Sequence, residues 1–311
     1  MTTTSTLLPA DTTMGRVGLD VADLDAMTRF YRDVLLLEVL EQGTASVSLG
    51  RRSASGAPDV LVTLNHRPDL PKGVRRSAGL FHTALLHPDA ASLATALASV
   101  AVQAPQLYTG AGDHHVSQAF YLDDPEGNGV ELYVDRPREQ WLRQNGRIYM
   151  TTEYIDPNAF LTEHLTDAGR NLIETAPDQR KGLVELGAQV VGHVHLKVGS
   201  TAQAKAFYVD KLGFEVTAEL PGALFVSAGG YHHHLAMNTW QSEGVGLRAP
   251  GLGLGLVTVQ VPRYALVRMV EDGVLGDAWA HEKAPSGASA DGSIELRDPW
   301  GNLVRIQSRE S

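Results

Sequence analysis

His114, Tyr121 and Glu131 follow one another in a short stretch of chain, and their side chains are of the types that bind metals and move protons. Asp124-Pro-Glu-Gly-Asn128 lies between the tyrosine and the glutamate, and Pro followed by Gly-Asn is typical of a reverse turn between two strands. The pattern therefore places the three side chains on consecutive strands. A carboxylate can bind a divalent metal ion, and imidazole or phenol groups beside it can exchange protons with a substrate.

Composition narrows the class of protein that could carry such a site. The chain has 311 residues, of which 43% are hydrophobic and 20% charged, enough for two soluble globular domains. Its formal net charge of −10 argues against nucleic acid and anionic membranes as partners. There is no cysteine, so any metal must be held by His, Asp or Glu. No apolar run approaches the roughly 18–20 residues of a membrane span. We expect a cytoplasmic protein whose segment Met1–Thr13 is a flexible tail.

The chain repeats itself, and the repeats indicate the elements that position these residues. Val17–Val21, followed by Phe30-Tyr31, recurs as Val194–Val198, followed by Phe207-Tyr208, and the Asp-Pro-x-Gly-Asn turn recurs at Asp298–Asn302. Each repeat has the pattern of an alternating strand, a helix and further strands. We expect four modules of one strand, one helix and three strands, at 14–70, 79–137, 189–242 and 252–309.

The modules predict two domains of the α+β class. The first would span 14–137 and the second 189–309. Between them, 138–188 is expected to be a structured linker, anchored by Trp141 and containing a helix over 157–173.

Four such modules resemble the vicinal oxygen chelate superfamily, which includes glyoxalase I, bleomycin-resistance proteins and extradiol dioxygenases. Gly112-Asp113-His114, Phe120-Tyr121 and Glu131 are most similar to the signature of two-domain catechol 2,3-dioxygenases. The resemblance covers almost the whole chain. It implies four βαβββ modules that form two cup-like half-barrels of mixed sheet, with metal ligands on the first and last strands of a module.

The resemblance also implies the metal ligands. The superfamily's ligand positions are occupied here, in chain order, by Arg16, His82, Glu131, His193, an apolar residue near Gly255, and Arg305. His82 alone would more often be a core histidine, and Glu131 alone a half-exposed strand residue. Together with His193 they match a triad of two histidines and one carboxylate, which in non-haem oxygenases holds Fe(II) and can also hold Mn(II).

All of these ligands fall in modules two and three, whereas ordinary extradiol enzymes use modules three and four. We therefore infer that modules two and three pair with each other and that modules one and four pair separately; the alternative is that a partner chain completes the cup. Arg16 and Arg305 would repel a metal, so the outer cup should be metal-free. These arginines should form structural ion pairs, for example with Asp20, or bind an anion. Glu295 lies one strand too early to be a ligand and is interpreted as structural.

Further roles follow from the same resemblance. The acid–base histidine would lie within Tyr231–Ala236. Strand alternation would put His232 and His234 on one face and His233 on the other, and we align His233 with the acid–base residue. A slip of one position, or a solvated cluster of histidines, is the alternative.

The remaining polar residues near the candidate site are assigned as follows. His114 would hydrogen-bond the substrate oxygens, and Tyr121 would contact the deprotonated hydroxyl of the substrate. The alternative for Tyr121 is a packed aromatic residue at a strand end. His195 shares the face of His193 and could line the pocket. The other histidines follow no pattern and are expected at the surface, namely His66, His87, His164 and His281.

The leading hypothesis is an Fe(II)-dependent extradiol dioxygenase that cleaves a catechol-type ring with O2. The first alternative is a glyoxalase-type metal-dependent lyase or isomerase, which would use four protein ligands. The second is a binding protein without catalytic activity that sequesters a small molecule such as an antibiotic. Dimers are frequent in the superfamily, so a homodimer is also an expectation.

Overall fold

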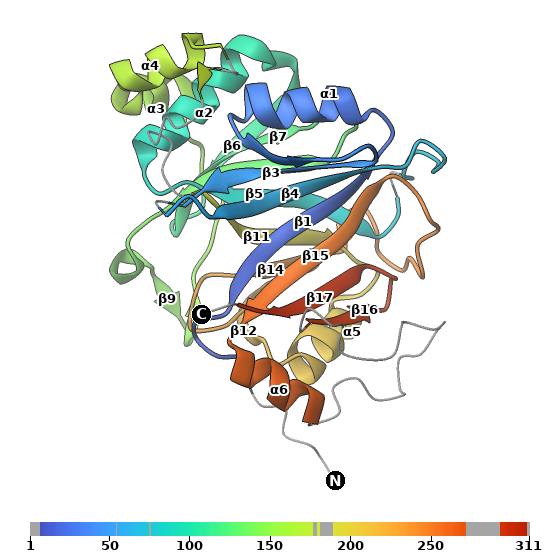
Figure 1. Ribbon diagram of the computed structural model, residues 1–311. Coiled ribbons are helices and arrows are strands. Elements are labelled where there is room, and N and C mark those ends of the chain that lie inside the picture. The colour runs from blue at the N-terminus through green and yellow to red at the C-terminus, as the bar shows by residue number, and fades with distance from the viewer. Residues whose placement is uncertain are drawn as a thin grey trace. The chain divides into compact units, whose positions relative to one another are not determined.

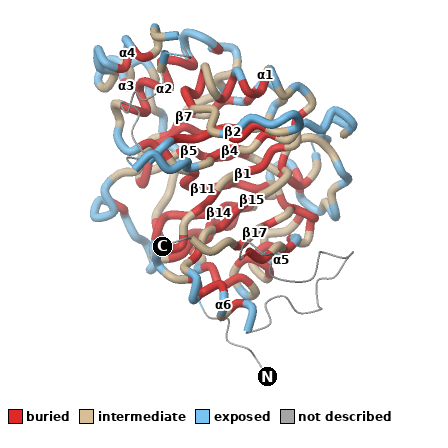
Figure 2. The backbone as a smooth tube through the Cα atoms, in the orientation of Figure 1, coloured by how far each residue is buried: buried red, intermediate tan, exposed pale blue. Residues whose placement is uncertain are grey.

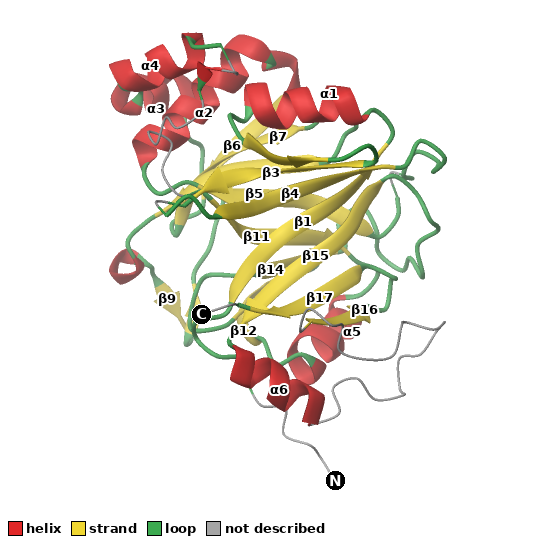
Figure 3. Cartoon of the chain, viewed as in Figure 1, coloured by secondary structure: helices red, strands yellow, loops and turns green. Residues whose placement is uncertain are grey.

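The computed structural model describes residues 7–53, 55–74, 76–176, 179–180, 189–271 and 293–309. Figures 1 and 3 show its mixed sheets and helices, and Figure 2 shows that the strands hold most of the buried residues while the loops are largely exposed. The predicted α+β class and its repeated modules are confirmed.

The first two modules have the predicted order of strand, helix and three strands. Module one comprises β1 (Thr13–Val21), α1 (Leu24–Arg29), the π-helical turn η1 (Phe30–Val34), β2 (Glu38–Gln42), β3 (Ser46–Arg52) and β4 (Pro58–His66). Module two comprises β5 (Gly79–Leu86), α2 (Ala90–Gln103), the 3-10 turn η2 (Pro105–Leu107), β6 (Tyr108–Asp113), β7 (Ser117–Asp123) and β8 (Gly129–Asp135).

The last two modules follow the same plan. Module three comprises β11 (Val190–Lys197), α5 (Thr201–Lys205), the π-helical turn η6 (Ala206–Lys211), β12 (Glu215–Leu220), β13 (Ala223–Ser227) and β14 (Leu235–Asn238). Of module four the structure describes β15 (Gly253–Val261), α6 (Arg263–Glu271), β16 (Ser293–Arg297) and β17 (Leu303–Ser308). Its residues 272–292 lie outside the described part of the chain.

The described strands of the four modules form two sheets that combine the modules as the candidate ligands predict, and β9 and β10 of the linker form a separate pair. The seven-stranded sheet, with the order β16-β17-β15-β1-β4-β3-β2, takes strands of modules one and four. The eight-stranded sheet, with the order β12-β13-β14-β11-β5-β8-β7-β6, takes strands of modules two and three. Modules two and three therefore share one sheet within a single chain.

The chain divides into two compact units, which cut across these sheets. Unit 1 takes the described residues of 1–18, 71–81 and 193–311, and unit 2 takes those of 19–70 and 82–192. Strands β1, β5 and β11 have residues in both units. The domain boundaries at 14–137 and 189–309 stay a prediction.

The repeated sequence motifs contact each other within each unit. In unit 2, Asp124 accepts the Asn128 amide (2.8 Å) and the Tyr31 hydroxyl (3.3 Å). In unit 1, Asp298 accepts the amide of Asn302 (2.9 Å) and the hydroxyl of Tyr208 (3.0 Å). The Phe-Tyr of one module is thus tied to the Asp-Pro-x-Gly-Asn turn of the next, which explains why both motifs repeat.

The linker is folded, but its helix is not continuous. It contains the 3-10 turn η3 (Arg138–Gln140), the short strands β9 (Arg143–Gln144) and β10 (Arg147–Ile148), and the helices α3 (Pro157–His164) and α4 (Asp167–Glu174). The helix predicted over 157–173 is broken because Thr166 caps a new helix, accepting the amide of Gly169 at 3.1 Å. Trp141 is buried, as expected of an anchor.

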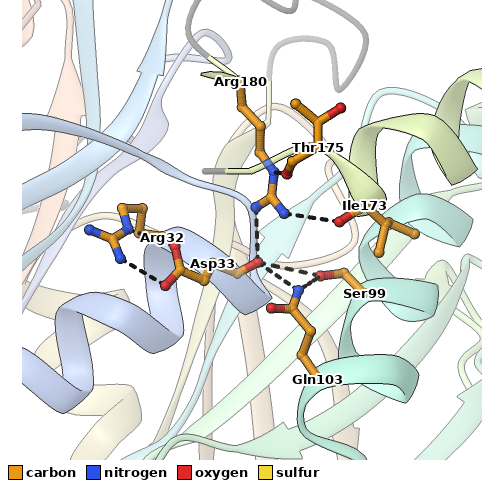
Figure 4. Close-up of polar contacts among 7 residues, drawn as sticks. All are labelled: Arg32, Asp33, Ser99, Gln103, Ile173, Thr175 and Arg180. Carbon is orange, nitrogen blue, oxygen red and sulfur yellow. Dashed lines mark hydrogen bonds and ion pairs between the residues drawn. The ribbon is translucent and has the colours of Figure 1, made fainter. Parts of the chain in front are cut away.

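A cluster of polar contacts joins the linker to modules one and two in unit 2 (Figure 4). The main-chain carbonyl of Asp33 accepts hydrogen bonds from Ser99 Oγ (3.5 Å), Gln103 Nε2 (2.9 Å) and Arg180 Nη1 (3.2 Å). Arg180 also donates to the carbonyls of Ile173 (3.1 Å) and Thr175 (2.8 Å), which end α4. One guanidinium group therefore satisfies carbonyls from two helical segments.

Part of the expected N-terminal tail is packed. Residues 1–6 lie outside the described part of the chain. Leu8, however, is buried and its amide donates to the carbonyl of Gly213 at 2.9 Å. In the same segment, the main chain of Ala10 lies close to Gly229, so a Cβ atom on residue 229 would collide with the carbonyl oxygen of Ala10.

Candidate metal site

His82 and Glu131 lie on the neighbouring parallel strands β5 and β8 of unit 2. Glu131 pairs in register with Ala84, two residues beyond His82, so the two side chains can meet on one face of the sheet. The Nε2 atom of His82 lies 3.0 Å from the Oε2 atom of Glu131. Both side chains are buried, with 7% and 2% of their residue surface exposed.

The donor set of this pair fits a divalent metal. Nitrogen and oxygen ligands lie about 2.0–2.2 Å from such ions, so two ligands at right angles are roughly 3 Å apart. The observed separation of 3.0 Å suits both a hydrogen bond and two adjacent ligands of one metal ion. Imidazole with carboxylate is a donor combination used by Fe(II) and Mn(II). The pair is therefore a candidate His/Glu metal site.

Tyr121 and His114 lie beside this pair, as the sequence predicts. Tyr121 on β7 pairs directly with Glu131 on β8, and its ring lies 5.6 Å from that of His82. Its hydroxyl is 2.7 Å from Nε2 of His114. Burial raises the pKa of Tyr121 well above its ordinary value, and the charge and hydrogen bond of Glu131 raise it further. The tyrosine is therefore held in its protonated form, in which it donates a hydrogen bond.

In unit 1, His193 lies against two of the three consecutive histidines. It is buried, and its ring centroid lies 4.1 Å from that of His233 and 5.9 Å from that of His232. The Nδ1 atoms of His232 and His233 are 2.8 Å apart. His233 is thus the consecutive histidine whose ring contacts His193 most closely.

His232–His234, expected within a strand, lie outside one. These residues form a bend before β14, which begins at Leu235. The bend is held by His234, whose Nδ1 accepts the Ala228 amide (3.2 Å) and lies 2.9 Å from Ser227 Oγ. All three histidines are buried, so the alternative of a solvated cluster is also wrong.

His195 stands in an aromatic group in unit 1. Its ring lies 4.9 Å from Phe81, 6.0 Å from Phe225 and 5.7 Å from Trp240, and Asn238 Nδ2 bonds its Nε2 at 3.0 Å. Trp240 also lines a cavity of about 510 Å³. The other residues that line this cavity are Arg76, Thr239, Gln241, Ser242, Glu243 and Val245. The aromatic group is a wall on which a planar ring could lie.

His87 was expected at the surface, and this is wrong. It is 1% exposed, and a ring nitrogen bonds Gln189 Nε2 at 3.0 Å. Gln189 Oε1 in turn accepts hydrogen bonds from the buried Arg51. Sequence reasoning missed this network because it joins modules one and two to the first residue of module three. Of the other histidines, His66 is exposed, His164 half-buried, and His281 lies outside the described residues.

The ligand position of module four holds an ion pair. Arg305 Nε lies 2.9 Å from Oε1 of Glu295, its partner on β16. This confirms the structural interpretation of both residues. Asp20, the partner suggested for Arg16, accepts a hydrogen bond from Asn65 at 3.2 Å.

Comparisons with known proteins show the family of the chain. The model of the Glyoxalase/Bleomycin resistance protein/Dioxygenase superfamily matches residues 13–132 and 190–306. The chain belongs to this superfamily. A catechol-2,3-dioxygenase of Bacillus subtilis is 35% identical over 305 residues, covering 94% of this chain and 96% of that protein. The predicted likeness to catechol 2,3-dioxygenases is thereby confirmed.

Solved structures show the same fold at lower identity. A putative dioxygenase from Bacillus subtilis superposes with a TM-score of 0.59 at 15% identity, covering 96% of this chain and 86% of that one. A variant of glyoxalase I from Zea mays gives a TM-score of 0.51 at 14% identity, covering 95% and 92%. Among the described residues, no helix is long and apolar enough to cross a membrane.

Proposed function

We propose that this protein is an extradiol ring-cleaving dioxygenase that acts on a catechol-type aromatic with O2 at a mononuclear Fe(II) site. The observation that carries the proposal is the buried His82–Glu131 pair, whose carboxylate and imidazole stand beside Tyr121 and its partner His114. The 35% identity to a catechol-2,3-dioxygenase supports the same reaction class. Mn(II) suits the same ligands.

His193 is proposed as the third ligand. It lies on β11, the neighbour of β5 in the eight-stranded sheet. In the sequence it takes the ligand position on the first strand of module three, as His82 does in module two. With His82 and Glu131 it would complete a set of two imidazoles and one carboxylate, a donor set that suits Fe(II).

The surrounding residues have the chemistry that catechol cleavage requires. When bound by these ligands, Fe(II) would supply the redox chemistry for the reaction of a catechol with O2. Tyr121, kept protonated, can donate its hydroxyl proton to a deprotonated catechol oxygen, and His114 orients that hydroxyl. His233, whose ring lies against that of His193, would pass a proton to the oxygen being cleaved. The aromatic group around His195 can carry the face of the ring.

The test is oxygen consumption by protein reconstituted anaerobically with Fe(II). A panel of catechols should give O2 uptake with the appearance of a yellow ring-cleavage product. Tyr121→Phe should lower the rate by about a hundredfold or more, whereas Tyr108→Phe, on β6, should not. If the iron-loaded protein consumed no O2 with any catechol of the panel, the proposal would be contradicted.

A further inference from the structure

The hairpin that carries His114 is joined to the linker by a two-residue bridge. Asp113 N donates to the Glu153 carbonyl (2.9 Å), and Glu153 N donates to the Asp113 carbonyl (2.8 Å). The side chain of Glu153 adds a hydrogen-bond contact, with its Oε1 atom 2.9 Å from Nε2 of His115, and His115 has a positive φ of 66°. Two main-chain hydrogen bonds and one side-chain contact thus fix this part of the linker against the turn between β6 and β7.

The bridge brings a linker carbonyl onto the ring of His114. The Thr151 carbonyl oxygen lies 2.7 Å from Nδ1 of His114, and the Thr152 hydroxyl lies 3.3 Å from the same atom. A carbonyl oxygen only accepts hydrogen bonds, so the proton of a neutral imidazole must be on Nδ1. Nε2 is then a bare acceptor, and it faces the hydroxyl of Tyr121 at 2.7 Å.

The strand beneath the ring is shaped for this placement. A Cβ at Gly112 would lie 2.9 Å from Cε1 and 3.1 Å from Nε2 of His114, and 3.1 Å from Cγ2 of Thr152. Both distances to the ring are shorter than ordinary contacts. Glycine at this position therefore leaves the room that the imidazole occupies between Tyr121 and the linker.

We propose that the linker residues Thr151–Glu153 are a positioning element of the active site: through the Thr151 carbonyl they fix His114 in the Nδ1–H tautomer, so that its Nε2 is an acceptor that faces the Tyr121 hydroxyl. This rests on the proposed function for its catalytic consequence, but not for the tautomer itself. The linker would thereby act on the substrate indirectly, by giving the single proton of the Tyr121 hydroxyl a second acceptor beside Glu131.

The direct test is ¹⁵N NMR of the imidazole rings in the metal-free full-length protein, with His114→Gln used to assign the His114 signals. The expected result is a protonated Nδ1 and an unprotonated Nε2. A protonated Nε2 with a bare Nδ1 in the wild-type protein overturns the inference. This readout needs no turnover, so it stands or falls separately from the dioxygenase activity.

Two variants test the cause. Glu153→Pro removes the amide that bonds Asp113 and should let the other tautomer appear, with kcat/KM lowered by about 10- to 100-fold. Tyr154→Pro, one residue later and outside the bridge, should keep the wild-type tautomer and rate. Gly112→Ala adds a Cβ that would displace the His114 ring, and it should break the contact of Nε2 with Tyr121. Retention of the wild-type tautomer in folded Glu153→Pro would refute the role of the linker.

Discussion

Lowering the pH should destabilise the folded protein through His87, because this imidazole is buried as a neutral group. Burial, and then the charge of Arg51, lower its pKa from 6.5 to about 3. Gln189 Nε2 donates to its ring, which suits the neutral form. Below pH 6.5 the unfolded chain binds a proton at this residue that the folded protein does not bind until about pH 3.

The magnitude follows from proton linkage. The unfolded state binds one more proton than the folded state over this interval, so the free energy of unfolding falls by about 1.4 kcal/mol for each pH unit. Between pH 6.5 and pH 5 the loss is about 2 kcal/mol, and by pH 3 it approaches about 5 kcal/mol. The stabilisation is fully present above pH 6.5 and is lost as the pH falls.

The assay is urea unfolding of the wild type and His87→Gln at pH 7.5, 6 and 5. Glutamine keeps an acceptor for Gln189 but does not titrate. Asp124 acts in the opposite direction, since burial raises its pKa to about 6, but it is common to both proteins. The wild type should therefore lose about 2 kcal/mol more than the variant between pH 7.5 and pH 5. A difference between the two proteins that does not change with pH would refute the reasoning.

Two further predictions concern packing beside the site and in the linker. Gly192→Ala places a Cβ on the hydroxyl of Tyr133, so it should lower the free energy of unfolding by about 1–3 kcal/mol. Gly246→Ala adds a Cβ in open space and should be nearly neutral. Equal midpoints of urea unfolding for the two variants would contradict this. Arg180→Met leaves the Asp33 carbonyl and the end of α4 without their charged donor. Urea unfolding should show a free energy of unfolding that is lower by about 2 kcal/mol. An unchanged midpoint would exclude a stabilising role for Arg180.

The sequence predicted the parts of the fold that repeat. The Asp-Pro-x-Gly-Asn turns and the Phe-Tyr pairs mark the modules because Asp124 holds Tyr31 and Asp298 holds Tyr208. Local patterns of this kind can be read from one chain. The contact of His82 with Glu131 also followed, because the two occupy matching positions in a repeated module.

Other features depend on contacts that no local pattern encodes. His87 was expected at the surface, yet it is buried against Gln189, which is 102 positions away in the chain. The bend at His232–His234 follows from Ala228 and Ser227 bonding His234, which overrides the alternation of a strand. The contact of Thr151 with His114 spans 37 positions and uses a main-chain carbonyl, so the side-chain sequence carries no sign of it.

The most direct test of the central claim is the metal content of anaerobically reconstituted protein, measured by mass spectrometry for the wild type and single variants. We expect one Fe(II) or Mn(II) per chain in the wild type and in His66→Ala, which alters an exposed histidine. Metal should be lost in His82→Ala, Glu131→Ala and His193→Ala. Full metal content in His193→Ala, with loss in the other two, would contradict a shared site formed by modules two and three.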